Sequence, residues 1–530
     1  MRAHRLQCER RQYAGLRMAS CAVVIAVAFL SLHGSMLIAQ SEPQQSVEQK
    51  IQKLNDAVAQ TQKQLEESQK QLEELRGQLA ALQQELAKDK ALATTAPASQ
   101  QPTPAQPTAI DELSEKQAMQ ESQIATQDQT KVESESKYPV KISGLLLLNG
   151  FVNTKQVDMA ATPTVALAGD GSTGASVRQT MLGIAARGPH LFGARSHADV
   201  SVDFDASASA GTASTASSTT IGYSNAYGGG SALLRLRTVH ASLDWENTQI
   251  YFSMDRPIIN PDSPTSLIAV AVPALAWSGN LWNWNPQIGV THNFSVTKSQ
   301  QLSIQAALID AADAPVSPVI PGAVYPQGNS DASTGEQSRW PGSEFRIALQ
   351  DKTSEESNHL GIGGYFAPHS TAYGWQFNSW ATSVDYRLRL SHGLQWSGDV
   401  YRGMALGGLG GGGYKDYVYR IGTYTGNQYS RALDDVGGWS QLKEKLNERL
   451  EFNAAVGMDE LFASELRPYA GASTATYQNL ARTRTFTGNV IYSPSSYLLF
   501  SLEYRHLESS PVVGATTDSN IIGLGAGYKF

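Results

Sequence analysis

Residues 521–530 read IIGLGAGYKF. Apolar side chains recur at every second position (Ile522, Leu524, Ala526, Tyr528 and Phe530), and glycine or lysine stands between them. This two-residue period predicts a β-strand with one apolar face. A soluble protein gains little from an apolar residue at a frayed end. A membrane barrel needs a last strand that closes against the first and shows one face to lipid.

The same alternation recurs through residues 138–530. Between positions 382 and 390, for example, Val384 and Leu388 alternate with Asp385 and Arg387. A soluble sandwich would turn the polar face outward, whereas a transmembrane barrel turns it toward the lumen, so alternation alone leaves both open. The terminal aromatic pattern resembles the recognition signal of bacterial outer-membrane barrels. Together with a secretory signal, it favours the barrel.

Composition and charge narrow the classes of protein. A charged fraction of 17% and 46 glycines in 530 residues fit a β-rich chain. Arginines precede an apolar run at 21–32, which predicts a signal peptide over 1–39. Both cysteines, Cys8 and Cys21, lie within it, so we expect a mature chain with no disulfide or thiolate site. The formal net charge of −7 argues against a nucleic-acid partner.

The segment before the predicted barrel has two parts. Over 45–90, apolar residues alternate at spacings of four and three, which predicts a coiled coil. Residues 91–137 are rich in proline and polar side chains and predict a linker. We expect the coil to lie in the periplasm and to form a homotrimer.

Connections within 138–530 alternate between short turns and long loops. Seven short turns and eight long loops predict about sixteen antiparallel strands, with the first long loop at about 154–176. This is an all-β transmembrane barrel, and sixteen strands enclose an aqueous channel.

The third long loop, 257–286, has an apolar stretch that needs a burial site. We expect it to fold into the lumen and narrow it. Its constriction candidates are Asp262, Trp277, Trp282 and Trp284. Packing against a neighbouring subunit, or an aromatic belt at the membrane interface, would also satisfy these residues.

Arginines on the predicted strands suggest a lumen that favours anions, because rings of cationic side chains attract anionic solutes. For any one arginine taken alone, a structural ion pair with a neighbouring Asp or Glu is the better interpretation. The alternation along 235–245 would place Arg235 and Arg237 on the lipid face. Two interpretations remain open: both lie above the apolar band, or a β-bulge shifts the register. The candidate pore-lining residues are Arg178, Arg346, Arg387, Arg389, Arg449, Arg505, Asp385, Glu451 and Glu503.

No other motif predicts a cofactor, metal or catalytic site. The glycine-rich run 403–413 lacks a phosphate-binding spacing, and we interpret it as a flexible external loop. Histidines such as His197 and His240 show no metal-ligand spacing along the chain.

Local stretches resemble the DcaP-like trimeric porins. They are Lys141–Gly144, Ser176–Gly183 and Leu234–Arg237, together with the coil, linker and terminal Phe. The resemblance implies a trimer that passes small anionic solutes such as dicarboxylates. The chain departs from the family at Thr180-Met181, where a more polar pair is expected, which affects one basic pore residue.

We therefore expect a non-enzymatic porin in the bacterial outer membrane, in contact with lipid and lipopolysaccharide. Three alternatives remain open. They are a phosphate-selective-type porin, a plugged structural or adhesive barrel that tethers the envelope, and an outer-membrane hydrolase.

Overall fold

The computed structural model describes residues 139–206, 233–316, 332–352, 357–371, 374–391, 393–421, 428–469 and 476–530. The predicted signal peptide, coiled coil and linker lie outside these residues.

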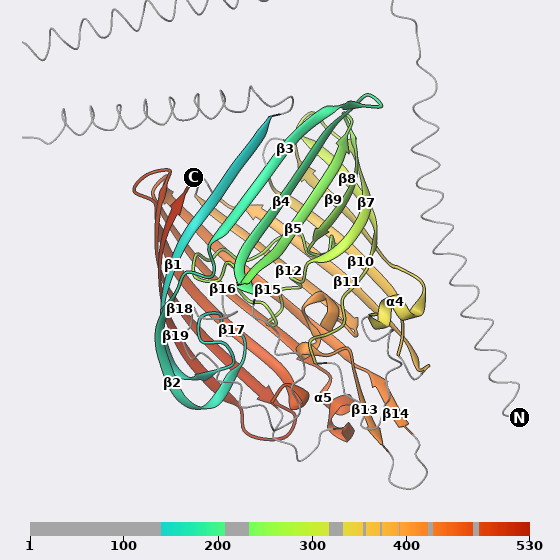
Figure 1. Cartoon of the computed structure of the whole chain (residues 1–530), viewed down its shortest axis with the longest axis vertical. Coiled ribbons are helices and arrows are strands. Elements are labelled where there is room, and N and C mark those ends of the chain that lie inside the picture. Colours follow the sequence, from blue (N-terminus) through green and yellow to red (C-terminus); the bar gives the residue numbers. More distant parts are fainter. Residues whose placement is uncertain are drawn as a thin grey trace, which may run out of the picture. The chain divides into compact units, whose positions relative to one another are not determined.

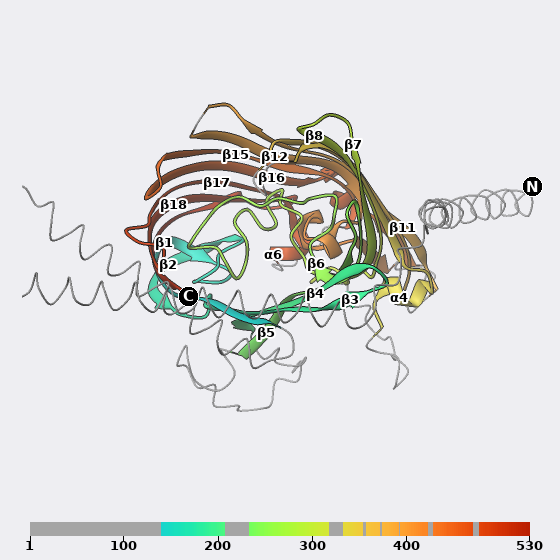
Figure 2. The ribbon, with the colours of Figure 1, turned by 90° about the horizontal axis from the view of Figure 1, so that it is seen from above.

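Sixteen antiparallel strands form a closed barrel, as predicted (Figures 1 and 2). Its segments are β1 (Val140–Val157), β2 (Ala166–Ser176), β3 (Met181–Leu191), β4 (Ala194–Ala206), β5 (Leu233–Asp244), β6 (Thr248–Asp255), β7 (Asn285–Ser295), β8 (Gln300–Ile309), β9 (Gly342–Asp351), β10 (His359–Ser370), β11 (Gln376–Arg389), β12 (Leu394–Met404), β15 (Asp434–Asn447), β16 (Leu450–Leu461), β17 (Leu480–Tyr492), β18 (Leu498–Pro511) and β19 (Thr517–Lys529). β2 and β3 share one strand position, because both pair with β1, over different parts of its length.

Smaller elements lie in the connections. They are the hairpin β13 (Tyr417–Ile421) and β14 (Gln428–Ala432), the α-helices α4 (Thr334–Ser338), α5 (Ala463–Leu466) and α6 (Thr476–Asn479), and the 3₁₀ turns η2 (Gly407–Leu409), η3 (Gly412–Tyr414) and η4 (Arg467–Tyr469). No helix in the described part of the chain is long and apolar enough to cross a membrane.

The terminal strand closes the barrel against the first. β19 pairs with β1 from Leu145 opposite Lys529 to Asn153 opposite Ile521. The backbones of Gly144 and Phe530 exchange two hydrogen bonds of 3.0 and 3.1 Å. The stretch that predicted the fold is therefore the seam of the barrel.

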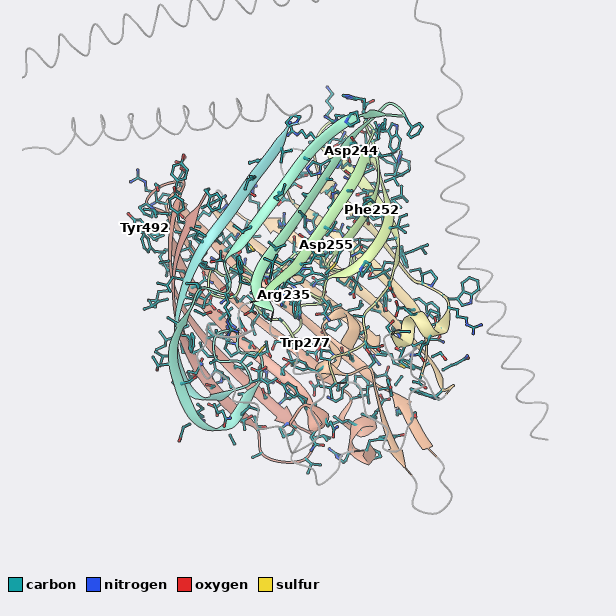
Figure 3. The ribbon with its side chains drawn as sticks, in the orientation of Figure 1. Arg235, Asp244, Phe252, Asp255, Trp277 and Tyr492 are labelled. Atoms are coloured by element: carbon teal, nitrogen blue, oxygen red, sulfur yellow. The ribbon has the colours of Figure 1, made fainter. Side chains whose placement is uncertain are left out.

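The strands are apolar outside and polar inside. On β11, Val384 is 44% exposed, whereas Ser383 and Asp385 are 2% and 0% exposed. Phe252 on β6 and Tyr492 on β17 are likewise exposed on the outer face (Figure 3). This pattern is the reverse of a soluble sandwich, and it identifies the outer surface as a lipid-facing one.

Short turns and long connections lie at opposite ends of the barrel. We call the end with the short turns, the start of β1 and Phe530 the turn end, and the other the loop end.

The first predicted long loop, 154–176, is shorter in the structure than predicted. β1 continues to Val157, β2 begins at Ala166, and only residues 158–165 connect them. Glycines and small polar residues in β2 have low strand propensity, which hid this strand in the sequence.

Candidate pore constriction

The connection between β6 and β7, residues 256–284, folds into the barrel. We call it the inner loop. Figure 2 shows it running through the interior of the ring of strands. Ile259, Leu281 and Ala271 are 0% exposed, and Leu275 is 3% exposed. The apolar stretch that needed a burial site therefore finds it inside the barrel.

Lumenal side chains of distant strands hold the backbone of the inner loop. Ser383 on β11 donates to the carbonyl of Ile259 at 2.7 Å. Asn149 on β1 donates to the carbonyl of Leu267 at 3.1 Å. Asn489 on β17 donates to the carbonyl of Thr265 at 2.8 Å. Because irregular backbone inside a barrel needs partners for its polar groups, these contacts fix the loop across the lumen.

Glycines on the barrel wall make room for the inner loop. A Cβ at Gly457 on β16 would lie 2.1 Å from the carbonyl oxygen of Ser278. A Cβ at Gly523 on β19 would lie 2.8 Å from the Ile268 side chain. Gly523 and Gly525 of the terminal strand thus face inward, where they accommodate the loop.

Gln179 clamps the inner loop at the break between β2 and β3. Its Nε2 donates to the carbonyl of Ile268 at 2.6 Å, and its Oε1 accepts from the amides of Val270 and Ala271 at 2.7 and 3.1 Å. The side chain is fully buried. Thr180 accepts a hydrogen bond from the Leu147 amide at 3.0 Å, which supports the broken strand. The sequence pattern did not predict this role of Gln179.

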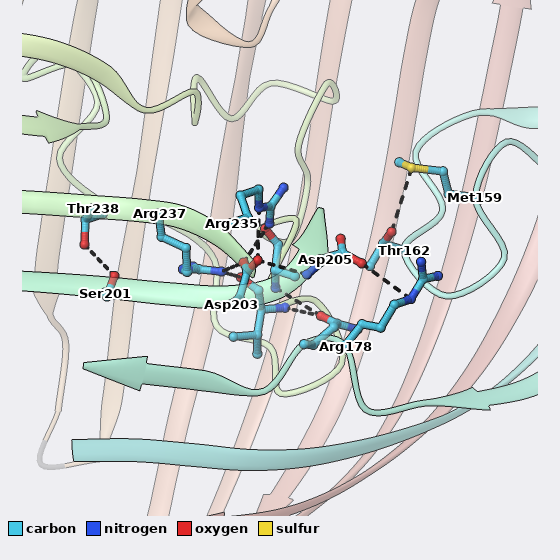
Figure 4. A network of polar contacts seen from close by, with 12 residues as sticks. Met159, Thr162, Arg178, Ser201, Asp203, Asp205, Arg235, Arg237 and Thr238 are labelled. Atoms are coloured by element: carbon cyan, nitrogen blue, oxygen red, sulfur yellow. Dashed lines mark hydrogen bonds and ion pairs between the residues drawn. The ribbon is translucent and has the colours of Figure 1, made fainter. Parts of the chain in front are cut away.

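A cluster of arginines lies beside the inner loop, with two of them on β5 and their carboxylate partner on β4 (Figure 4). Arg235 and Arg237 bind Asp203 at 2.7 and 2.9 Å. The same guanidinium groups donate to the carbonyls of Ala271 and Val270 at 2.7 and 2.9 Å. They therefore link the wall to the loop by charge-assisted hydrogen bonds.

A β-bulge directs both arginines inward. Ser201 pairs with Thr238, but the adjacent Val202 pairs with Leu236, so Arg237 is the extra residue. Residues on β5 before the bulge consequently have the opposite parity to those after it. The sequence left two interpretations open for Arg235 and Arg237, and the structure has the β-bulge.

Arg178 and Trp284 complete this arginine cluster. Arg178 Nε lies 3.9 Å from Asp205 Oδ1. The guanidinium carbons of Arg235 and Arg237 lie 5.1 and 4.6 Å from the ring centroid of Trp284, a cation–π geometry. The side chains of Arg178 and Arg235 are 27% and 25% exposed, whereas that of Asp203 is fully buried.

On the wall made by β9, β10 and β11, the charged residues that were predicted to line or narrow the pore form ion pairs with one another. Arg346 binds both carboxylate oxygens of Asp385 at 2.8 and 2.5 Å. His359 Nε2 lies 3.3 Å from carboxylate oxygens of both Asp262 and Asp385. Arg387 forms an ion pair with Asp262. Asp262 therefore fastens the inner loop to this wall.

The remaining predicted pore-lining residues fall into two groups. Glu503 and Arg505 on β18 are buried and paired at 2.7 Å, and Glu503 also accepts from Ser266 of the inner loop at 2.5 Å. Arg389, Arg449 and Glu451 lie toward the turn end. Arg449 precedes the first residue of β16 and belongs to the turn, and Glu451 lies 3.8 Å from Lys443.

The three loop tryptophans have different environments. Trp277 and Trp282 are 4% and 8% exposed and belong to an apolar cluster. Trp277 stacks on Tyr414 with ring centroids 4.1 Å apart. Trp284 lies partly exposed beside the arginine cluster.

The prediction of a flexible external loop at 403–413 is wrong. Residues 405–416, the glycine-rich segment, are buried. The amides of Gly412 and Gly413 donate to Asp435 and Asp459 at 2.7 and 2.9 Å. Lys415 donates to the carbonyls of Gly413, Tyr477 and Leu480 at 2.7, 2.9 and 2.8 Å, and burial lowers its pKa to about 7. Gly410, Gly412 and Gly413 adopt positive φ, which permits this compact path.

Comparisons with known proteins give structural matches alone: no family model and no curated protein matches the chain. The outer-membrane channel DcaP of Acinetobacter baumannii is 15% identical, with a TM-score of 0.49, over 74% of this chain and 99% of that one. An anion-selective porin from Comamonas acidovorans is 8% identical, with a TM-score of 0.43, over 74% and 100%. The trimer form of OmpT from Vibrio cholerae is 9% identical, with a TM-score of 0.40, over 74% and 100%. Values this low transfer neither family membership nor function to this chain.

Proposed function

We propose that the protein is an outer-membrane channel for the diffusion of small anionic solutes. The inner loop narrows the lumen, and the arginine cluster of Arg178, Arg235 and Arg237 favours anions. The bulge on β5 carries this proposal, because it brings Arg235 and Arg237 to the lumenal side of the wall, against the inner loop. Planar guanidinium groups at a constriction match carboxylate and phosphate groups.

The balance of charge supports a preference for anions. Three guanidinium groups of the arginine cluster face the two carboxylates of Asp203 and Asp205. Asp203 is buried beneath the arginines, so the surface offered to water is cationic. On the wall made by β9, β10 and β11, Arg346 and Arg387 are each bound to a carboxylate, which reduces their effect on a passing ion.

The test is the reversal potential of a variant in which Arg235→Gln, Arg237→Gln and Asp203→Asn are combined. Including Asp203 avoids leaving a buried carboxylate unpaired. The matched control is Arg482→Gln with Arg484→Gln, which removes two charges from the outer face of β17. We expect the triple variant alone to lose anion preference. Equal reversal potentials in the wild type and the triple variant would refute the role of the cluster.

A plugged structural barrel is the second candidate. It is favoured by the burial of the glycine-rich segment and by Thr164 and Val165 of the 158–165 connection, which are 4% and 0% exposed. A correctly folded barrel that passes no current would support it. A phosphate-selective channel would instead conduct chloride and be blocked by millimolar phosphate.

Assembly as a homotrimer through the coil at 45–90 is part of the proposal. Deleting these residues should weaken the trimer and leave the barrel folded, as measured by native electrophoresis and circular dichroism. An unchanged trimer would show that the barrel alone suffices.

A further inference from the structure

The lumenal face of β4 and β5 carries a second group of polar side chains, on the turn-end side of the arginine cluster. It consists of His197, Asp199 and His240, which we call the His–Asp–His group. Each residue offers one nitrogen or oxygen, and these ligand atoms lie within 4.8 Å of one another. The proposed channel does not use them.

Strand pairing brings these residues together. His197 and Asp199 are two positions apart on β4 and so share its lumenal face, together with Asp203. His240 is the direct cross-strand partner of Asp199. Because the pairing joins residues 41 positions apart, spacing along the chain gave no sign of the group.

The distances suit one metal ion. Nδ1 of His197 lies 3.6 Å from Oδ1 of Asp199, and Nδ1 of His240 lies 3.7 Å from the same oxygen. Ligands at ordinary Zn–N and Zn–O distances in a tetrahedral site are about 3.3 Å apart. Small side-chain rotations would therefore complete the geometry.

The surroundings leave room for the ion and for water. The cross-strand neighbours on either side are small: Ala185 faces Asp199 from β3, and Ser253 faces His240 from β6. The Tyr251 ring stacks on His240 with centroids 5.8 Å apart, which orients the imidazole. The three side chains are 27–36% exposed, so an ion can enter from the lumen.

Two further charged residues lie on the same face. Arg187 on β3 is the cross-strand partner of His197, and Arg195 on β4 is the cross-strand partner of Asp244. Arg187 and Arg195 are exposed, and water screens their repulsion of a cation.

We propose that the His–Asp–His group is a binding site for a divalent transition-metal ion of the Zn²⁺, Ni²⁺ or Cu²⁺ type. Two imidazoles and one carboxylate are the ligands that these ions favour, and three protein ligands leave a coordination position for water. The bound ion would add positive charge to the wall that also holds the arginine cluster.

The test is titration of the refolded full chain in detergent with ZnCl₂, followed by calorimetry, using protein without a polyhistidine tag. Co²⁺ absorption in the visible range gives an independent measure of coordination. The matched control is His292→Gln, because His292 lies on the outer face of β7 and bonds to Thr248.

We expect one equivalent of Zn²⁺ to bind to the wild type and to His292→Gln. His240→Gln and Asp199→Asn should each weaken binding at least tenfold, since loss of even an outer partner of a metal ligand typically costs about 10–100-fold. No binding to the wild type, or equal binding to all four proteins, would overturn the proposal. The binding measurement does not depend on whether the barrel conducts.

Discussion

Gln179 lies in the break between β2 and β3, and its side-chain amide donates to the carbonyl of Ile268 in the inner loop at 2.6 Å. The same side chain accepts from two further amides of the inner loop. An interrupted strand thus supplies a clamp for the loop. A continuous strand would use these backbone positions for pairing alone.

Replacing this clamp should loosen the inner loop. In Gln179→Leu, the Ile268 carbonyl and the amides of Val270 and Ala271 lose their partner, and each buried unsatisfied group costs about 1–3 kcal/mol. We expect larger and noisier single-channel currents, and faster proteolysis within 256–284. Gln301→Leu, on the turn-end part of β8, is the control. Identical currents and cleavage in both variants would contradict a clamping role.

A single methyl group on the wall should displace the inner loop. Gly457→Ala places a Cβ 2.1 Å from the Ser278 carbonyl oxygen, which the backbone cannot accommodate without moving. Gly488→Ala on β17 is the matched control, because its nearest contact would be 3.9 Å away. We expect Gly457→Ala alone to change conductance and lower the melting temperature. If both variants kept the conductance and melting temperature of the wild type, the inner loop would not rest on this wall.

Lys415 should give the protein a pH-dependent stability. Its pKa is about 7 in the folded protein and near 10.5 in the unfolded chain, so the unfolded state binds more protons between these values. The free energy of unfolding contributed by this group therefore rises with pH in that window, by at most about 1.4 kcal/mol per pH unit.

The check is the difference in melting temperature between the wild type and Lys415→Met at pH 7, 8.5 and 10. Taking the difference removes the titration of other groups. We expect the melting temperature of the wild type to rise relative to that of Lys415→Met as the pH increases. A constant difference would mean that Lys415 keeps its proton when buried.

The sequence predicted the barrel well because its signals are local. Alternation along each strand, the short turns and the terminal Phe530 together indicated sixteen strands and the seam of the barrel. The strand at 166–176 was missed because Gly169, Gly171 and Gly174 weaken its pattern.

The candidate site was less predictable because it depends on cross-strand contacts. The bulge that turns Arg237 inward was one of two possibilities that parity allowed. The pairing of His240 with Asp199 and the burial of the glycine-rich segment arise from contacts between residues far apart in the chain. Composition alone gave the glycine-rich segment the appearance of a mobile loop.

The most direct test of anion diffusion is the planar-bilayer current of the purified full chain, with its reversal potential in a KCl gradient. We expect open-channel steps and a reversal potential displaced toward the chloride equilibrium potential, because the arginine cluster is cationic where it meets water. Steps with a cation preference, or no current from a barrel shown to be folded, would contradict the proposed anion channel.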